Sequence, residues 1–367
     1  MEPDRLSGLP DFLLIKILSS LKAREVAQTC ILSKRWRHLW ASVPCLHFDH
    51  AEFSSKLSAE SCERFKKFVS SFLLSFDETY NLDLFHLTCH GHTYFYDDIT
   101  EAVGMWITQA VKYKPKTLKL EFSYCMYLTL PGSLFISDSL QELYLSLKHW
   151  LDVTPEVVYL PNLKRLNVCF VYIGEKYIKK ILNGCPMLES LSVESSWLVT
   201  KDVSFGNMKR LSMTNCRELD VLSSCVNVEV LQIWSSSNLM DLLKVTIQNP
   251  MIFYKLKRLD LGTCCMNCAF GTLSSLLERT PKLETLILWH KCCYEVKVRG
   301  RCEENESQNS REKIEWYYCK CLKEVQIMSE KDGKSDTAPQ LVERVKQCTK
   351  GLLEVRVVIS YSSKELV

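Results

Sequence analysis

The sequence has no cluster of like charges and no long apolar run, and these two absences exclude large classes of function. The formal net charge is only +3, and charged residues make up 24% of the 367 residues. Lysines and arginines do not gather into a basic patch, so we expect no nucleic-acid partner. The apolar run from Phe12 to Leu18 contains Lys16 and is far shorter than the roughly 20 residues of a membrane helix. We therefore expect a chain that is neither secreted nor membrane-spanning, in the cytoplasm, the nucleus or both.

Signatures of common catalytic sites are missing as well. The sequence has no glycine-rich phosphate loop, no paired histidines on a helix, no nucleophile elbow and no kinase signature, and its eight histidines are scattered. Nothing singles out one of the eighteen cysteines as a nucleophile beside a basic partner. The sequence therefore predicts a protein without a catalytic site and without a cofactor.

The cysteines are spread over a long chain without a secretion signal, which favours a reducing compartment and thiols that are buried as small apolar groups. The densest group holds Cys264, Cys265 and Cys268, and only the last two have the spacing of zinc ligands. No second matching pair follows at the distance of a zinc module, so no metal site is predicted. A metal-dependent enzyme remains an alternative that elemental analysis for zinc would reveal.

The first forty residues have the pattern of three short helices rich in large apolar side chains. Pro10 fits the first turn of a helix, and Asp11 places a negative charge where the helix dipole favours one. A second apolar stripe includes Val26, and Ser33 is placed to cap a third helix. A segment below about 40 residues buries too little surface to be stable alone, so part of this apolar surface should need another protein.

This region resembles an F-box in the form common among plant proteins. The resemblance covers roughly residues 5–45, and it rests on the Leu9-Pro10 start, the leucine-rich first helix and the ending from Leu32 to Trp40. It implies docking onto the Skp-type adaptor of a cullin-based SCF ubiquitin ligase. The residues for which it implies contact with the adaptor are Leu9, Pro10, Leu13, Leu14, Ile17, Leu18, Val26, Leu32, Ser33, Trp36 and Leu39. The alternative is a helical cap or partner-dependent bundle with another purpose.

One residue departs from the F-box pattern. Lys22 follows Leu21 at a place where many members of the family have proline. We expect this change to alter only the turn between the first two helices.

From about residue 116 a Leu-x-x-Leu-x-Leu unit recurs along the chain. The middle residues of its copies, taken from Leu143 to Leu286, are separated by 23, 25, 20, 20, 28 and 27 residues. These steps lie inside or near the range of about 20 to 29 residues that is typical of leucine-rich repeats. Degenerate copies flank the series, at Leu118 before it and at Leu322 and Leu352 after it.

The repeat predicts a solenoid. Alternation along a short strand sends both residues of the Leu-x-Leu pair into the core and the residue between them to the open face. The phrase Cys185-Pro186-x-Leu188-Glu189-x-Leu191 also resembles the leucine-rich repeats that follow plant F-boxes. The predicted fold is α/β, with an N-terminal three-helix F-box followed by a curved leucine-rich-repeat solenoid that has a parallel concave sheet. An ordinary α/β domain with leucine-rich strands is the alternative.

The chain is thus expected to have five parts. Residues 1–48 are the F-box, 49–115 an irregular helical and strand cap of the solenoid, and 116–298 the leucine-rich repeats. Residues 299–315 are polar and charged and are predicted to form a loop. Residues 316–367 predict a strand, a helix and a strand, an order that resembles the FBD region of plant F-box proteins with leucine-rich repeats. The whole chain therefore resembles the plant F-box/FBD/leucine-rich-repeat family.

Strand alternation also indicates what the open face of the sheet carries. Its middle row should include Asp260 and Ile287, and a neighbouring row includes Trp234 and Trp289. Exposed tryptophan and arginine dominate binding hot spots, so Arg210, Trp234, Arg258 and Trp289 are the candidate substrate contacts. The alternative is that the tryptophans pack under a loop or under the tail.

Taken together, these features predict a substrate-recognition subunit of a ubiquitin ligase. The F-box would bind a Skp-type adaptor and through it a cullin, the repeats would bind an unidentified protein target, and the partner subunits would ubiquitinate the target for degradation. The main alternative is a leucine-rich-repeat interaction scaffold that is not coupled to ubiquitination. Pulldown with adaptor and cullin distinguishes the two.

Overall fold

The computed structural model describes most of the chain and divides it into two compact units, Met1–Leu188 and Glu189–Val367. The described residues are 6, 8–53, 59–76, 81–89, 97–122, 128–152, 155–173, 175–195, 197–198, 206–214, 227–234, 252–264, 270–290, 316, 318–330, 338–350, 352 and 355–362. The predicted boundaries at residues 48 and 115 both lie inside the first unit. The F-box, the cap and the first repeats therefore belong to one compact body.

The predicted three-helix F-box is present at the start of the first unit. Its helical segments are α1 (Asp11–Leu18), α2 (Ala23–Gln28), η1 (Thr29–Ile31), α3 (Trp36–Leu39) and η2 (Trp40–Ser42). Pro10 immediately precedes α1 in an extended conformation, so the predicted helix start is displaced by one residue. The buried core of the module consists of Leu14, Leu18, Val26, Trp36, Leu39 and Val43.

The prediction that Ser33 caps the third helix is wrong. The residue before α3 is Arg35, which already has helical φ and ψ angles of −61° and −45°, and no side chain caps this helix. Arg35 instead reaches the start of the first helix, where its Nε donates to Asp11 Oδ1 over 2.7 Å and its guanidinium donates to the carbonyl of Leu9 over 2.6 Å. The start of α3 is therefore held by contacts between helices.

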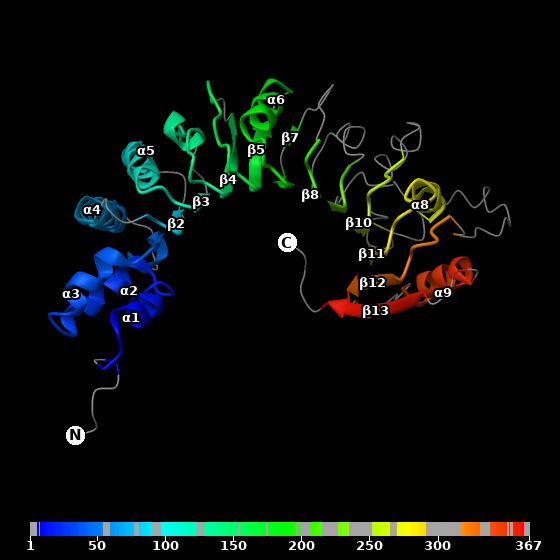
Figure 1. Cartoon of the computed structure of the whole chain (residues 1–367), viewed down its shortest axis with the longest axis horizontal. Coiled ribbons are helices and arrows are strands. Elements are labelled where there is room, and N and C mark those ends of the chain that lie inside the picture. Colours follow the sequence, from blue (N-terminus) through cyan, green and yellow to red (C-terminus); the bar gives the residue numbers. More distant parts are fainter. Residues whose placement is uncertain are drawn as a thin grey trace. The chain divides into compact units, whose positions relative to one another are not determined.

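The rest of the first unit alternates strands with helical segments. Their bounds are β1 (Cys45–Asp49), η3 (His50–Phe53), α4 (Ala59–Ser75), β2 (Leu84–Cys89), α5 (Asp97–Lys112), β3 (Thr117–Phe122), η4 (Gly132–Phe135), β4 (Glu142–Asp152), β5 (Arg165–Ile173) and α6 (Glu175–Gly184). Each strand from β1 to β5 pairs in parallel with the next. Helices α4 and α5 lie on one side of strands β2 and β3, which leaves the other side of this sheet as an open inner face (Figure 1).

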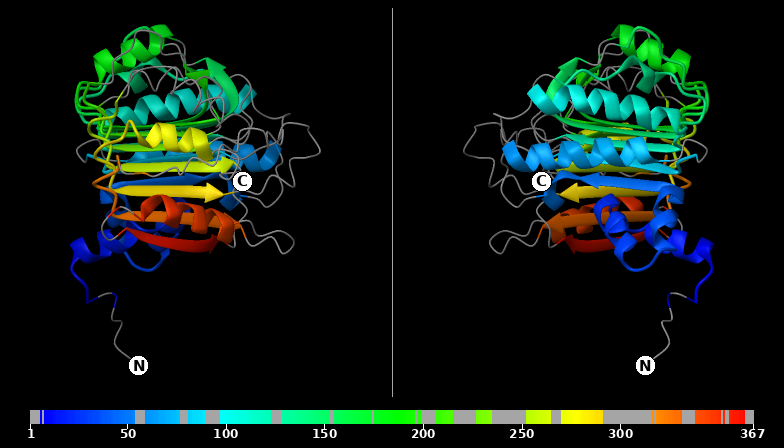
Figure 2. Two further views of the ribbon diagram at one scale, coloured as in Figure 1. Left: turned by 90° about the vertical axis from the view of Figure 1, so that its right-hand side faces the viewer. Right: turned by 90° about the vertical axis from the view of Figure 1, so that its left-hand side faces the viewer.

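The second unit is also built mainly from parallel strands, with described helices only after β10 and β12. Its described elements are β6 (Ser190–Glu194), β7 (Trp197–Leu198), β8 (Arg210–Thr214), β9 (Val230–Trp234), β10 (Arg258–Cys264), α8 (Phe270–Leu277), β11 (Thr285–His290), β12 (Glu324–Glu330), α9 (Ala338–Thr349) and β13 (Arg356–Ser362). Strands β6, β8, β9, β10, β11, β12 and β13 are consecutive parallel neighbours. Figure 2 shows α9 lying alongside β12 and β13, which confirms the predicted strand, helix and strand at the end of the chain.

The alternation that predicted the repeats is confirmed residue by residue. In β8, Leu211 and Met213 are buried, whereas Arg210 is exposed and Ser212 is half-buried. All repeat positions from Leu140 to Ile327 that the Leu-x-x-Leu-x-Leu unit assigns to the core are buried. Leu352 and Val357, in the degenerate last copy, are only half-buried. Stacking of successive coils therefore supplies the apolar core that one coil lacks.

A row of ion pairs lies just before the strands of the second unit begin. The pairs join Glu189 to Lys209 over 2.8 Å, Glu229 to Lys257 over 3.0 Å and Glu284 to Lys323 over 2.6 Å. The backbone carbonyl of each glutamate in turn accepts a hydrogen bond from the amide of the lysine paired with it. Because the acidic and basic residues alternate from coil to coil, a shift of one coil would bring like charges together.

The C-terminal strand, helix and strand is anchored to the last repeat through an aromatic stack. Trp316 stacks on Phe270 of α8 with ring centroids 5.6 Å apart, and its indole N–H donates to Ser274 over 3.0 Å. The guanidinium of Arg344, on α9, lies 4.2 Å from the centroid of the Phe270 ring. This stack joins α8 to α9 and makes the tail part of the second unit.

Some predictions fall outside the described residues. They include the polar loop at 299–315, the polar turn at Gly333 and the cysteine pair Cys265 and Cys268. Within the described part of the chain, no helix has the length and apolar character needed to span a bilayer.

Candidate functional site

The F-box leaves several large apolar side chains outside its own core. Exposed fractions are 68% for Phe12, 42% for Ile17, 86% for Ile31 and 60% for Leu32. Two of these residues lie on α1, and the other two lie at the end of η1 and immediately after it. Large apolar side chains exposed together in one small module mark a surface for a partner.

The structure sorts the predicted adaptor contacts into two groups. Five of them, Leu14, Leu18, Val26, Trp36 and Leu39, are buried in the F-box core. They hold the module in shape, and their burial removes them from direct contact with a partner. The remaining predicted contacts are exposed or half-buried, namely Leu9, Pro10, Leu13, Ile17, Leu32 and Ser33.

Sequence reasoning missed Phe12 and Ile31, the two most exposed apolar residues of the F-box. A signal for Phe12 was available. Leu14 and Leu18 are four residues apart and define the buried stripe of α1, and a residue two positions from Leu14 faces the opposite side of the helix. No comparable signal exists for Ile31, because the 3₁₀ turn that exposes it is not part of a longer period.

Several contacts join the F-box to the first coil of the repeats, among them a hydrogen bond from Arg24 to the carbonyl of Glu52. Lys22 Nζ binds Asp49 Oδ2, at the end of β1, over 2.6 Å, and this hydrogen bond raises the pKa of the lysine. The guanidinium of Arg24 lies 4.9 Å from the centroid of the Phe53 ring. Trp40 meets Phe72 of α4 edge to face, with ring centroids 4.7 Å apart. The expectation that Lys22 alters only a turn is therefore wrong, because its side chain also connects the F-box to the sheet.

The inner face of the second unit carries a pair of tryptophans. The rings of Trp234, on β9, and Trp289, on β11, have centroids 4.9 Å apart. Gly262 lies on β10 between them, and a Cβ atom there would lie 3.2 Å from Cγ of Trp234 and 3.3 Å from Cβ of Trp289. Both tryptophans are half-buried. The two rings can therefore meet over β10 because this position has no side chain.

The predicted substrate contact Arg258 is already engaged within the chain. Its Nε lies 3.0 Å from Oδ1 of Asp260, its terminal nitrogen lies 3.1 Å from Oδ2, and Gln232 donates to Oδ2 over 2.7 Å. The Asp260 side chain is only 3% exposed, because these partners cover it. Ile287, next to Asp260 in register, is buried as well. The prediction that Asp260 and Ile287 line an open middle row is thus wrong.

Arg210 differs from Arg258 in having no such partner. It is exposed at the start of β8, in register with Ser190 on one side and Val230 on the other. Both of these neighbours are uncharged, and so is Ser212, the next residue of β8 on the inner face. Among the described residues, none forms a hydrogen bond or ion pair with the Arg210 guanidinium. Within the described residues, this cation is therefore exposed and unpaired.

The inner face of the first unit is built differently, from groups that bind one another. His47 and His86 stack in register on β1 and β2 with ring centroids 4.2 Å apart. His86 Nε2 lies 3.1 Å from Glu121 Oε1, yet burial outweighs this carboxylate and lowers the pKa of His86, as it lowers that of His47. Sequence reasoning missed this pair because it placed no strand over 45–49.

Two further strands continue this network in the first unit. Glu142 accepts a hydrogen bond from Arg165 over 2.7 Å and another from the Tyr144 hydroxyl over 3.1 Å. The ammonium of Lys119 lies 4.8 Å from the centroid of the Tyr144 ring. The charges of this face are thus largely matched within the chain.

Four of the described thiols, those of Cys89, Cys185, Cys319 and Cys348, are buried, whereas Cys321 is exposed. Burial raises the pKa of Cys185 to about 12 and that of Cys319 to about 11, which disfavours the nucleophilic thiolate. Within the described ranges, no three histidine, cysteine or acidic side chains gather as ligands for a metal ion.

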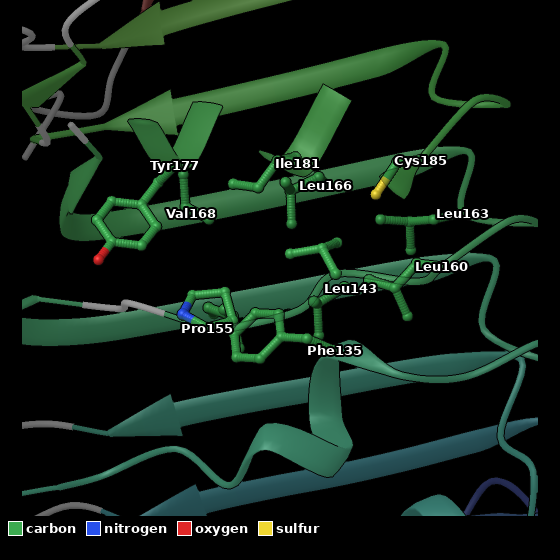
Figure 3. Close-up of a pocket in the computed structure, with 12 residues that line it drawn as sticks. Phe135, Leu143, Pro155, Leu160, Leu163, Leu166, Val168, Tyr177, Ile181 and Cys185 are labelled. Carbon is green, nitrogen blue, oxygen red and sulfur yellow. The ribbon is translucent and has the colours of Figure 1, made fainter. Parts of the chain in front are cut away.

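A small apolar cavity lies in the core of the first unit. Tyr177 and Ile181 of α6, Phe135 of η4, and Leu143 and Leu166 of β4 and β5 point into it (Figure 3). Its volume of about 30 Å³ is close to the volume of one water molecule. This cavity is therefore a packing gap beneath α6, too small for an organic ligand.

Comparisons with known proteins agree with this architecture. A family model for the F-box domain matches residues 6–48, and a model described as the leucine-rich repeats of the FBD-associated F-box protein At5g56370 matches residues 104–204.

Several curated proteins of Arabidopsis thaliana are similar to this chain. A putative F-box protein, At1g58310, is 34% identical over 235 residues, which are 59% of this chain and 46% of that protein. F-box/LRR-repeat protein 13 is 33% identical over 53% of this chain and 42% of its own length. The F-box/FBD/LRR-repeat protein At2g04230 is 31% identical over 81% of this chain and 66% of its own length. The chain spans about half the length of the first two relatives.

Proposed function

Because this chain belongs to the plant F-box/FBD/leucine-rich-repeat family, we propose that it is the target-recognition subunit of an SCF-type cullin ubiquitin ligase. In this proposal the F-box binds a Skp-type adaptor, the repeats bind a protein target, and the assembled ligase ubiquitinates the target for degradation. The observation that carries the proposal is an F-box that folds around its own core and still exposes Phe12, Ile31 and Leu32.

The adaptor contact follows from the position of these exposed side chains. Burying one large apolar side chain contributes about 1.5 to 3 kcal/mol, so a few of them suffice for a specific interface. The F-box core residues keep α1 and η1 in place beneath this surface, and their contribution to binding is indirect. For direct binding we retain the predicted contacts that lie outside the core, and we add Phe12 and Ile31. The retained contacts are Leu9, Pro10, Leu13, Ile17, Leu32 and Ser33.

Rigid linkage is the mechanism by which such a subunit would accelerate ubiquitination. The Lys22 to Asp49 ion pair and the edge-to-face contact of Trp40 with Phe72 hold the F-box against the first coil. A target held by the repeats would then stay at a restricted distance from the adaptor. Holding two reactants at a constant separation raises their effective concentration and lowers the entropic part of the barrier.

This chain supplies binding in the proposed complex, and the chemistry belongs to its partners. Ubiquitin transfer through a cysteine needs a thiolate of low pKa. Burial instead raises the pKa of Cys30, Cys45 and Cys62, as it does for Cys185 and Cys319. These groups are therefore poor candidates for a ubiquitin-carrying nucleophile.

Adaptor binding by the full chain tests the proposal. We expect the wild-type chain to capture a purified Skp-type adaptor, and the double variant Ile31→Ser, Leu32→Ser to bind it about 100-fold more weakly. Leu74→Ser is the matched control, because Leu74 on α4 is 83% exposed and lies outside the F-box. Its affinity for the adaptor should equal that of the wild type.

Two results would contradict the proposal. A wild-type chain that fails to bind the adaptor while capturing a protein target would support the scaffold alternative. A double variant that binds the adaptor as tightly as the Leu74→Ser control would show that the exposed F-box residues are not the contact.

A further inference from the structure

We propose that the inner face of the second unit binds an extended acidic segment of the target. In this segment a carboxylate contacts Arg210, and an apolar side chain four or five residues away packs on the pair Trp234 and Trp289. The inference rests on the proposed function, because it specifies the kind of target that the repeats recognise.

The charge of this face points to a single carboxylate. Lys209 is paired with Glu189, Lys257 with Glu229, and Arg258 with Asp260. Arg210 lies among these residues on the same sheet and is exposed, and among the described residues it has no partner. A guanidinium binds a carboxylate through two parallel hydrogen bonds, which makes an acidic side chain its best-matched ligand.

The tryptophan pair supplies the second contact. The two rings support each other over Gly262, so they offer an apolar surface that loses little conformational entropy on binding. The indole N–H of Trp234 is shielded from solvent and has no acceptor among the described residues. An unmade hydrogen bond of this kind is destabilising by about 1 to 3 kcal/mol. A small rotation of the ring would allow a carbonyl of a bound segment to accept it.

The register of the strands sets the distance between the two contacts. Arg210 is level with Val230, and Trp234 lies four residues farther along β9, which is about 13 Å at roughly 3.3 Å per residue. Trp234 is one strand away from β8, and the point over β10 where the two rings meet is two strands away. Each strand adds about 4.8 Å sideways. The separation is thus about 14 to 16 Å, which an extended chain covers in about four or five residues.

The same features disfavour a nucleic acid on this surface. Binding a phosphate backbone requires several free cations in a row. The lysines beside Arg210 are instead neutralised by glutamates, and its nearest neighbours in register are a serine and a valine. An exposed guanidinium that pairs with no described residue, close to an aromatic surface, matches a peptide with one acidic and one apolar anchor.

A peptide series tests the predicted spacing. Each fluorescent peptide would carry one glutamate and one leucine in a background of glycine and serine. The leucine would lie about two to eight positions after the glutamate in one set and before it in another. Fluorescence anisotropy would measure the binding of each peptide to the full chain. We expect the tightest binding at a separation of four or five positions, and about tenfold weaker binding when lysine replaces glutamate. Affinity that does not depend on the spacing or on the acidic residue would overturn the inference.

Variants then locate the binding site. Arg210→Glu should weaken the best glutamate peptide about tenfold and strengthen its lysine counterpart, whereas Trp289→Leu should weaken both peptides. Lys346→Glu is the matched control, since Lys346 is exposed on α9, on the other side of the sheet from the inner face. Equal losses in Arg210→Glu and Lys346→Glu would mean unspecific attraction and would contradict the assignment. Unfolding midpoints equal to the wild type would show that each variant is folded.

Adaptor capture, measured with the same preparations, separates this inference from the proposed function. Adaptor binding without peptide selectivity overturns only the acidic-segment inference. Peptide selectivity without adaptor binding overturns the ligase assignment and leaves the binding site intact. The chain could also bind a second copy of itself on this face, and its size in solution would then increase with concentration. If this self-association blocked the peptides, the occupant would be a second copy, and the inference would be overturned.

Discussion

The F-box and the repeats place the same kind of residue in opposite environments. The leucines of the repeats are buried between neighbouring coils, and Leu259 of β10, for example, is 0% exposed. In the F-box, Leu32 is 60% exposed, next to Ile31, although both residues fit the apolar pattern of the module. Apolar residues at regular spacing therefore serve stability in the repeats and are available for binding in the F-box.

The difference arises from what each region can stack against. A repeat has a neighbouring coil on each side, which covers both edges of its apolar layer. The F-box contacts a coil on one side only, through Lys22, Arg24 and Trp40, and its remaining surface has no further element of the first unit to cover it among the residues described. A second protein can supply the missing neighbour.

The largest expected effect follows from exchanging one leucine in each region. Leu259→Ala should lower the free energy of unfolding by about 2 to 5 kcal/mol, because it removes buried methyl groups and leaves a cavity. Leu32→Ala should change it by less than about 0.5 kcal/mol, because this side chain is already in solvent. Urea unfolding of both variants gives the comparison. Similar losses in the two variants would mean that the F-box residue is part of a core.

A second prediction examines how tightly the repeats are filled. A Cβ atom on Gly184, at the end of α6, would clash with the backbone carbonyl of Val158 and lie 2.7 Å from its Cγ1 atom. Gly184→Ala should therefore destabilise the chain by about 1 to 3 kcal/mol, the usual range for overpacking. Gly132→Ala is the control, because a Cβ atom on Gly132 would meet no described atom within 4 Å. Thermal unfolding that is equal in both variants would contradict a close-packed turn at Gly184.

Much of this comparison was accessible from the sequence. Every position from Leu140 to Ile327 that the Leu-x-x-Leu-x-Leu unit assigned to the core is buried, because strand alternation and coil stacking depend on local spacing. The Leu9-Pro10 start located the F-box within one residue. Both signals come from backbone geometry, which neighbouring residues determine.

The candidate sites were less accessible, because they depend on which side chains meet across strands. The sequence placed Arg258 and Asp260 on one face but did not show that the two bind each other, whereas Arg210 pairs with no described residue. It also aligned Trp234 with Trp289 without showing that Gly262 lets their rings meet. Such contacts depend on rotamers and register, which a repeat period does not specify.

A third prediction concerns pH and the histidine pair at the start of the sheet. Burial lowers the pKa of His47 and His86, so both favour the neutral form in the fold, while the unfolded chain takes up protons from about pH 6.5 downward. The neutral pair therefore makes its full contribution to the free energy of unfolding above about pH 6.5. This contribution is lost as the pH falls through the lowered pKa values of the folded state. Thr88, Glu121, Lys119, Asp49 and Lys22 are the polar and charged groups around the pair.

Melting temperatures from about pH 7.5 down to about pH 5.5 check this prediction. The melting temperature of the wild type should fall more steeply across this range than that of the double variant His47→Gln, His86→Gln. His38→Gln, in the exposed part of α3, is the control and should follow the wild type. Parallel curves for the wild type and the double variant would show that the pair does not titrate with folding.

The smallest expected effect lies where the two compared regions meet. The Lys22 to Asp49 pair is partly exposed, with 37% of the lysine side chain in solvent, so its coupling should be about 0.5 kcal/mol and should weaken with added salt. A double-mutant cycle with Lys22→Met and Asp49→Asn measures this coupling.

Because the pair joins the F-box to β1, the substitutions should loosen the contact between the F-box and the first strand while leaving the repeat core intact. Hydrogen exchange should therefore increase in α2 and β1 but not in β10 or β11. Uniformly faster exchange would mean that the F-box and the repeats unfold as one unit, and the contrast between the two regions would then hold for their surfaces but not for their stability.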